Sequence, residues 1–99
     1  MIIHEFDINK LNEIVASGTV VLDFYADWCG PCKMLGQVLE TLEGIDIIKV
    51  NVDDNEVLAK EYRVMSIPDM YIFKDGEIVK EIVGFRSKEE IEEEINSIK

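Results

Sequence analysis

The stretch "VVLDFYADWCGPCKML", residues 20–35, joins an apolar run to a segment that holds both cysteines of the 99-residue chain. Its first part, residues 20–26, is rich in β-branched and aromatic residues and is interrupted by one carboxylate, Asp23. An apolar run without alternation is typical of a strand that is covered on both faces, as in a parallel sheet. Cys29 and Cys32 follow, where helical spacing begins. The sequence therefore predicts that the two thiols lie at the junction of a buried strand and a helix.

Other segments extend this alternation of strands and helices in both directions. Asp75-Gly76 is a strong hairpin signal between two strand-like runs. Ser87 and Glu90 have the spacing of a capping box at the start of a last helix. The predicted elements are a strand in residues 1–7, a helix over 8–17 that ends at Gly18, the strand 20–26, a helix from the cysteines to Gly44, a strand at 45–53, a short helix through Tyr62, strands at 70–73 and 78–83, and a helix in 87–99.

This order, β-α-β-α-β-α-β-β-α, predicts an α/β fold with a mixed central sheet. Right-handed crossovers place helices on both faces of such a sheet. The length suits a single domain that spans residues 1–99.

Composition and charge exclude several classes of function. The net charge of −11 argues against nucleic acid, whose phosphates would be repelled, and against an anionic membrane surface. No apolar run approaches the roughly 18 residues of a membrane span. The N-terminal "MIIHEFDINK" lacks the features of a secretory signal. Two cysteines without such a signal indicate a cytoplasmic protein in a reducing compartment.

The spacing of the two cysteines suits neither a structural disulfide nor a metal site. Closing a loop of four residues stabilises a fold by only roughly 2 kcal/mol, and strain reduces that. A zinc site needs four ligands, and the only histidine, His4, lies far along the chain. We therefore expect no bound metal and interpret Cys29 and Cys32 as a dithiol that opens and closes.

The two thiols are predicted to be unequal. Cys29 sits just before a helix, where unpaired N–H groups and the helix dipole favour a negative charge and lower a thiol pKa from about 8.5. Cys32, one turn into the helix, would be less exposed and less acidic. Gly30 lets another chain's backbone approach, and Pro31 suits the first turn of a helix. This asymmetry suits one attacking thiol and one resolving thiol.

Asp23 is the one charged residue in the run that precedes the cysteines. Burying a lone carboxylate is costly, and desolvation would raise its pKa toward neutrality. Asp23 is thus a candidate general base for Cys32, acting through a water. The alternative is an aspartate at the edge of the strand that faces solvent.

Three motifs resemble those of the thioredoxin family: "DFYADWCGPCKM" (23–34), "SIPD" (66–69) and "FKDGEIV" (73–79), the last followed by "VG" at 83–84. The similarity covers essentially the whole chain in the same order of elements. It implies the thioredoxin fold and a protein disulfide reductase that cycles by dithiol–disulfide exchange. The Gly-Pro dipeptide between the cysteines implies a reductant, because disulfide-forming relatives tend to carry a histidine there.

The resemblance also implies partners. They are client proteins that contain disulfides and a thioredoxin reductase that regenerates the dithiol, while the protein itself acts as a monomer without a bound cofactor. Two other functions stay open from the sequence. One is a disulfide oxidase or isomerase, and the other is a binding module that keeps the cysteines passively.

Further site residues are implied by position in the family pattern. Asp23 matches the family's buried aspartate, and Lys49 falls where the family has a lysine near that aspartate, although a solvated strand lysine is the alternative. A trans bond is the default before Pro68, since only about 5–6% of X–Pro bonds are cis.

The resemblance instead implies a cis bond at Ile67–Pro68, which turns the backbone of Ile67 toward the dithiol. There it could pair with an extended client segment. Trp28, Ile67, Gly84 and Phe85 are expected to form an apolar surface around the site.

Three departures from the family pattern stand out. Gly36-Gln37 replaces a proline that usually kinks the second helix, which concerns the shape of that helix. Asp69 follows Pro68 where threonine is common, and Phe85 follows Gly84 where a small residue is frequent. The last two lie near the expected recognition surface and bear on the choice of partner.

Overall fold

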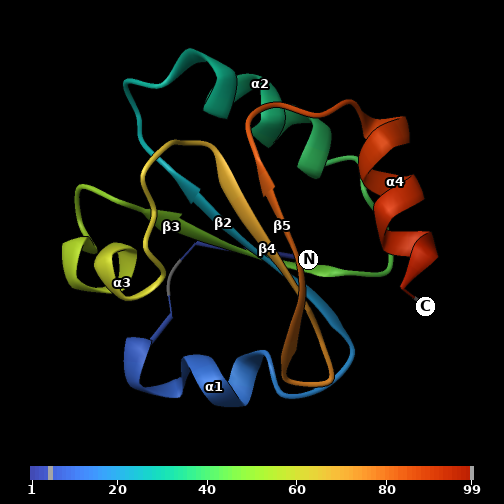
Figure 1. The fold of residues 1–99 in the computed structure, drawn as a ribbon, viewed down its shortest axis with the longest axis horizontal. Helices are drawn as coiled ribbons and strands as arrows, with labels where there is room; N and C mark the ends of the chain where they lie inside the picture. Colours follow the sequence, from blue (N-terminus) through green and yellow to red (C-terminus); the bar gives the residue numbers. More distant parts are fainter. Residues whose placement is uncertain (5, 99) are drawn as a thin grey trace.

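The computed structural model describes residues 1–4 and 6–98 of the chain. Figure 1 shows a central sheet with helices packed around it. The strands are β1 (Ile2–Ile3), β2 (Thr19–Tyr25), β3 (Asp46–Asn51), β4 (Asp69–Lys74) and β5 (Glu77–Val83). The helices are a 3₁₀ turn (Ile8–Lys10) that leads into α1 (Leu11–Ile14), then α2 (Gly30–Leu39), α3 (Glu56–Glu61) and α4 (Lys88–Ser97).

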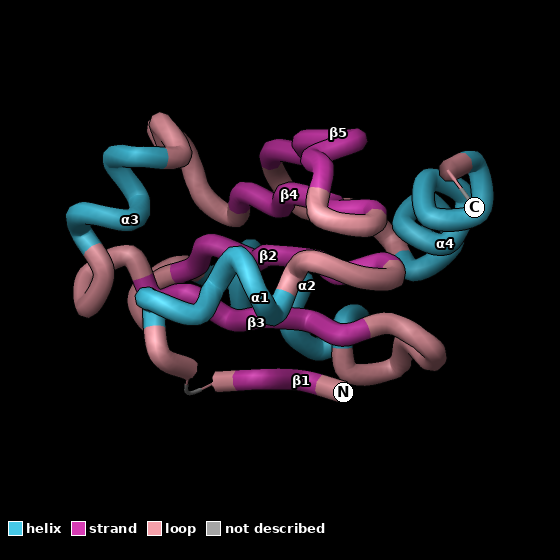
Figure 2. Tube along the Cα trace, turned by 90° about the horizontal axis from the view of Figure 1, so that it is seen from below, coloured by secondary structure: helices cyan, strands magenta, loops and turns pink. Residues whose placement is uncertain are grey.

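The sheet has the strand order β1-β3-β2-β4-β5, which can be followed from edge to edge in Figure 2. β1, β3 and β2 run parallel, whereas β4 is antiparallel to both β2 and β5. β2 thus occupies the middle of the sheet and is buried over almost its whole length. The predicted α/β fold with a mixed sheet is confirmed.

Each face of the sheet carries its own apolar core, because successive strand residues point to opposite faces. On one face, Leu22 and Phe24 of β2 pack with Leu11 of α1 and Leu58 of α3. The opposite face is covered by α2 and α4. Its cluster contains Val21, Leu35, Leu39, Ile45, Ile47, Met70, Ile72, Ile82, Ile91 and Ile95. Helices therefore cover both faces, as the sequence predicts.

Several elements are shorter than the sequence indicates, among them the first strand, the first helix and α2. The predicted strand 1–7 forms only at Ile2–Ile3, and Glu5 lies outside the described residues. Within the predicted helix 8–17, helical structure covers only residues 8–14. α2 ends at Leu39 rather than running to Gly44, because the chain then tightens into turns in which each N–H bonds to the carbonyl three residues earlier.

Two local signals form as predicted. Asp75 and Gly76 both adopt positive φ, 49° and 89°, in the turn between β4 and β5. Ser87 and Glu90 form both hydrogen bonds of a capping box at the start of α4. In the part of the chain that the structure describes, no helix has the length and hydropathy needed to cross a membrane.

Candidate redox site

Cys29 and Cys32 form a disulfide at the start of α2, with their Cα atoms 5.2 Å apart. Cys29 has extended backbone angles as the N-cap residue, and Cys32 lies in the first helical turn. The backbone N–H of Cys32 donates to Sγ of Cys29 across 3.2 Å. A helix N-terminus therefore directs a donor at one sulfur of the pair, which favours negative charge there once the disulfide is opened.

The two residues between the cysteines have separate structural roles. Pro31 occupies the first turn of α2, where a missing N–H breaks no helical bond. A Cβ atom built on Gly30 would meet nothing within 4 Å. Packing within the chain therefore does not require a glycine at position 30, and the space beside this residue is open.

Asp23 and Lys49 form a buried ion pair behind the disulfide. The two residues are register partners on β2 and β3, and Nζ of Lys49 lies 2.8 Å from Oδ2 of Asp23. Asp23 is completely buried and Lys49 is only 9% exposed, so the solvent-facing alternatives for both residues are excluded. The ammonium also lies 4.3 Å from the ring centre of Tyr25.

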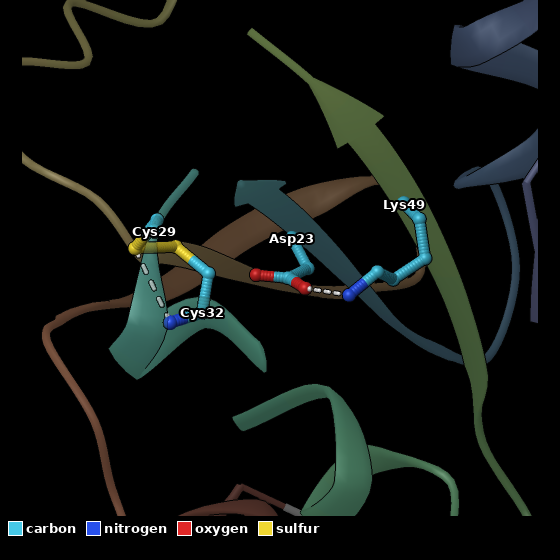
Figure 3. A network of polar contacts seen from close by, with 4 residues as sticks. All are labelled: Asp23, Cys29, Cys32 and Lys49. Atoms are coloured by element: carbon cyan, nitrogen blue, oxygen red, sulfur yellow. Dashed lines mark hydrogen bonds and ion pairs between the residues drawn. A yellow bond between two sulfur atoms is a disulfide. The ribbon is translucent and has the colours of Figure 1, made fainter. Parts of the chain in front are cut away.

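Burial raises the pKa of Asp23, and the attraction and hydrogen bond of Lys49 offset only part of that rise. Figure 3 shows the Asp23 carboxylate between the disulfide and Lys49, with one oxygen bonded to the ammonium and the other turned toward the cysteines. This second oxygen, Oδ1, accepts no hydrogen bond from the described residues. A buried carboxylate with one oxygen free of hydrogen bonds from the described residues thus lies beside the cysteine pair.

The loop before β4 brings backbone to the other side of the disulfide. The Ile67–Pro68 bond is cis, as expected. The carbonyl oxygen of Ile67 lies 3.9 Å from Sγ of Cys29. Gly84, whose φ is 92°, donates its N–H to the carbonyl of Pro68 across 2.8 Å. The end of β5 and the Ile67–Pro68 loop are thereby held together beside Cys29.

Apolar side chains surround this loop and remain accessible. Trp28 is 70% exposed and Phe85 is 37% exposed. An apolar pocket of about 200 Å³ adjoins Trp28, and its lining residues are Trp28, Val52, Ala59, Val64, Met65, Ser66 and Ile67. Trp28 and Ile67 thus line one apolar pocket, which also reaches Ala59 of α3, a residue that the sequence analysis did not indicate.

Sequence reasoning missed three features of the site. Asp53 accepts a hydrogen bond from Nε1 of Trp28 at 2.9 Å, which fixes the indole, and no sequence signal marks that pairing. A Cβ on Gly36 would lie 3.5 Å from Nζ of Lys49, so this position lies beside the ion pair as well as shaping α2. Asp69 is only 1% exposed and therefore is not part of the recognition surface itself.

Comparisons with known proteins agree with this geometry. A family model described as thioredoxin matches residues 3–97. The chain is 47% identical over 90 residues to a thioredoxin of Staphylococcus haemolyticus, covering 86% of each chain. It is 46% identical over 86 residues to a thioredoxin of Bacillus subtilis, covering 82% of this chain and 83% of the relative.

The chain belongs to the thioredoxin family. Among solved structures, a mutant thioredoxin from Halobacterium salinarum superposes with a TM-score of 0.89 at 37% identity, covering 97% of this chain and 88% of the other. A thioredoxin from Malassezia sympodialis gives 0.83 at 27% identity, with 97% and 91% covered.

Membership of the thioredoxin family defines the chemistry of the site. The protein is a thiol–disulfide oxidoreductase, and its redox-active pair is the Cys29–Cys32 disulfide at the start of α2. The family implies disulfide-containing proteins as substrates and a thioredoxin reductase as the source of electrons. Within residues 1–4 and 6–98, no group of three or more His, Cys, Asp or Glu side chains could hold a metal ion.

Proposed function

We propose that this oxidoreductase acts as a general reductant of protein disulfides, with Cys29 as the attacking thiol and Cys32 as the resolving thiol. The observation that carries the proposal is the 3.2 Å contact from the N–H of Cys32 to Sγ of Cys29. In the reduced protein this donor favours a thiolate at Cys29, and the thiolate is the nucleophile in disulfide exchange.

The reaction proceeds in two exchanges. The Cys29 thiolate attacks one sulfur of a client disulfide, which forms a mixed disulfide and releases the other client sulfur as a thiolate. Cys32 then loses its proton and attacks Sγ of Cys29, which restores the Cys29–Cys32 bond and releases the second client thiolate. Two electrons pass from the dithiol to the client, and the two thiolates of the client take up two protons.

Asp23 is the proposed base for the second exchange. Its Oδ1 is buried and accepts no hydrogen bond from the described residues, while Oδ2 is held by Lys49 at 2.8 Å. Because burial raises the pKa of this carboxyl, it is a stronger proton acceptor than a solvent-exposed aspartate. A water between Oδ1 and Cys32 would carry the proton, and Lys49 fixes the orientation of the carboxylate.

The client is proposed to bind along the Ile67–Pro68 loop in an extended conformation. The carbonyl of Ile67 lies 3.9 Å from Sγ of Cys29, so a client strand paired there would have its disulfide beside the nucleophile. Trp28 and Gly84 flank this position. Gly30, next to Cys29 in the chain, faces open space, which suits close approach of a second backbone.

We also propose a single domain of residues 1–99 that acts as a monomer in the cytosol. The radius of gyration is 12.3 Å, close to the roughly 13 Å expected for a compact domain of 100 residues. The net charge of −11 disfavours self-association through mutual repulsion. The cytosol supplies the reducing conditions that a dithiol reductant needs.

Two measurements test whether the protein reduces the disulfides of its clients. Catalysed reduction of insulin by dithiothreitol should be fast, whereas a module with passive cysteines would leave the uncatalysed rate unchanged. A redox titration should give a potential near the family's usual value of about −270 mV. A potential near about −120 mV would instead indicate a disulfide oxidase and would overturn the reductant assignment.

A further inference from the structure

Asp69 is a second buried carboxyl near the dithiol, and the mechanism above does not use it. It begins β4 directly after Pro68 and is 1% exposed. Its Oδ1 is buried and accepts no hydrogen bond from the residues described. Burying a carboxylate without partners is costly, so this position requires an explanation.

The neighbour of Asp69 across the strand pair is another acidic residue. On β5, Val83 lies opposite Asp69 and Glu81 lies opposite Tyr71, which makes Glu81 the diagonal neighbour of Asp69 on the same face of the sheet. Two neighbouring carboxylates repel each other, and a proton on one of them removes the repulsion. The strand register therefore favours a proton on one member of the pair.

The surroundings favour the proton on Asp69. Glu81 is exposed on the edge strand β5, whereas Asp69 is enclosed. Burial, followed by the neighbouring Glu81 and the charge of Asp23, raises the pKa of Asp69 to about 7. The hydroxyl of Tyr71 donates its proton to the carbonyl of Tyr62 at 2.6 Å, so it is not a donor to Asp69. No ion pair links Asp69 to a lysine or arginine among the described residues.

We propose that Asp69 and Glu81 form a second proton site, which makes the Cys29–Cys32 pair more strongly reducing as the pH rises through neutrality. Asp69 is joined through Pro68 to Ile67, whose carbonyl oxygen lies 3.9 Å from Sγ of Cys29. Asp69 is thus two residues along the chain from a carbonyl that lies beside the sulfur that becomes a thiolate on reduction. Like charges in a buried setting repel, so ionised Asp69 disfavours the reduced form.

The redox step itself is unchanged. Dithiothreitol gives two electrons and two protons to the disulfide, its own two thiols close into a cyclic disulfide, and the Cys29–Cys32 bond opens. Above the pKa of Cys29, one of the two protons passes to solvent and leaves a thiolate. Asp69 is therefore a positioning residue that acts on this equilibrium by its charge, and it has no contact with the client.

The inference rests on the proposed roles of the two cysteines, but a different experiment tests it. Wild type, Asp69→Asn and Asp69→Thr would each be equilibrated with dithiothreitol buffers between pH 5.5 and 8.5, and the oxidised fraction read by thiol trapping. Glu77→Gln, which removes an exposed charge at the far end of β5, is the matched control. Thermal melts at each pH identify any variant that does not fold.

We expect the variants to match wild type at pH 5.5. At pH 8.5 they should be about threefold easier to reduce, because they lack a nearby negative charge. Glu81→Gln keeps Asp69 but removes its acidic neighbour, which lowers the pKa of Asp69. The reduction equilibria of Glu81→Gln and Asp69→Asn should therefore begin to differ at a lower pH than those of wild type and Asp69→Asn. The Glu77→Gln control should follow wild type throughout.

A ratio between wild type and Asp69→Asn that is flat with pH would overturn the inference, whether the ratio is one or not. A ratio that differs from one but does not change with pH would indicate a purely structural role for Asp69. If wild type fails to reduce insulin, the proposed reductase function fails, yet the equilibrium with dithiothreitol still tests Asp69. If wild type reduces insulin and the ratio stays flat, only the second proton site is lost.

Discussion

On both sides of the Cys29–Cys32 disulfide, side chains lie in surroundings that are unusual for residues of their type. On the outer side, Trp28 is apolar and 70% exposed. On the inner side, Asp23 and Lys49 are charged and buried. Exposed apolar residues and buried charges are each uncommon in soluble proteins unless they have a role. We propose that the two sides have separate roles, with client binding on the outer side and proton transfer on the inner side.

Removing the attacking sulfur should have the largest effect, because it abolishes the chemistry that both sides serve. Cys29→Ser should lower multiple-turnover reduction of insulin by at least about 10³-fold, since a positioned intramolecular thiol acts at a very high effective concentration. The turbidity assay for insulin reduction measures this loss. Residual activity above a tenth of wild type would mean that Cys32 can attack by itself.

On the inner side, Asp23→Asn should slow the release of the client about tenfold or more near neutral pH, because a positioned base is lost. Rapid-mixing measurements of the second exchange, compared with the formation of the mixed disulfide, would locate the defect. The exposed Asp54→Asn carries the same chemical change and should leave both steps as they are. Equal slowing of both exchanges would contradict the assignment of Asp23 to resolution.

Asp23→Asn should also raise the free energy of unfolding above neutral pH. The pKa of Asp23 is raised in the folded protein, so its carboxylate costs stability as the pH rises from about 3.9, the unfolded value, through the folded pKa. Asp23→Asn removes that cost. The gain in the free energy of unfolding should be small near pH 4 and largest at pH 8, and urea titrations at the two pH values measure it.

On the outer side, Trp28→Ala should raise the KM for insulin about fivefold and leave kcat nearly unchanged, because exposed aromatic anchors contribute mainly to binding. Asp53→Ala frees the indole by removing its 2.9 Å hydrogen bond and should cause a smaller change of about twofold. A fall in kcat as large as the rise in KM would place Trp28 in the chemical steps and weaken the separation of the two sides.

The smallest effect on function is expected away from both sides. Ser87→Ala removes the side chain that caps α4 and should cost about 1 kcal/mol of stability. Insulin reduction should stay at the wild-type level, because none of the residues placed in the site lies on α4. The free energy of unfolding and the rate of insulin reduction of Ser87→Ala together show whether a loss of stability alone changes turnover. This result shows how far lost stability could contribute to the effects of the other variants.

The sequence predicted the fold where local patterns are strong. The strand at 20–26, the hairpin at Asp75-Gly76 and the cap at Ser87 each depend on spacing within a few residues, and all three form. The end of α2 and the extent of β1 depend on tertiary packing, so their predicted bounds were too long.

The site was predicted less completely than the fold, for the same reason. Cys29 and Cys32 are close together in the sequence and could be found by their spacing. The contact of Asp53 with Trp28 joins residues 25 positions apart, and Asp69 and Glu81 are diagonal neighbours on two paired strands. Such neighbours follow from tertiary packing and strand register, which the sequence alone did not supply. Asp69 is buried at the start of β4, which pairs with β2 on one side and β5 on the other.

The measurement that tests the account most directly is covalent trapping of clients by the two cysteine variants. Cys32→Ser and Cys29→Ser would be mixed with a cytosolic extract and with purified insulin, and the products separated on a non-reducing gel. If Cys29 attacks and Cys32 resolves, Cys32→Ser should accumulate mixed disulfides that dithiothreitol releases, because nothing beside the bond can displace the client. Cys29→Ser should accumulate none. Equal trapping by the two variants, or trapping by Cys29→Ser alone, would contradict the assignment even if the wild-type protein reduces insulin.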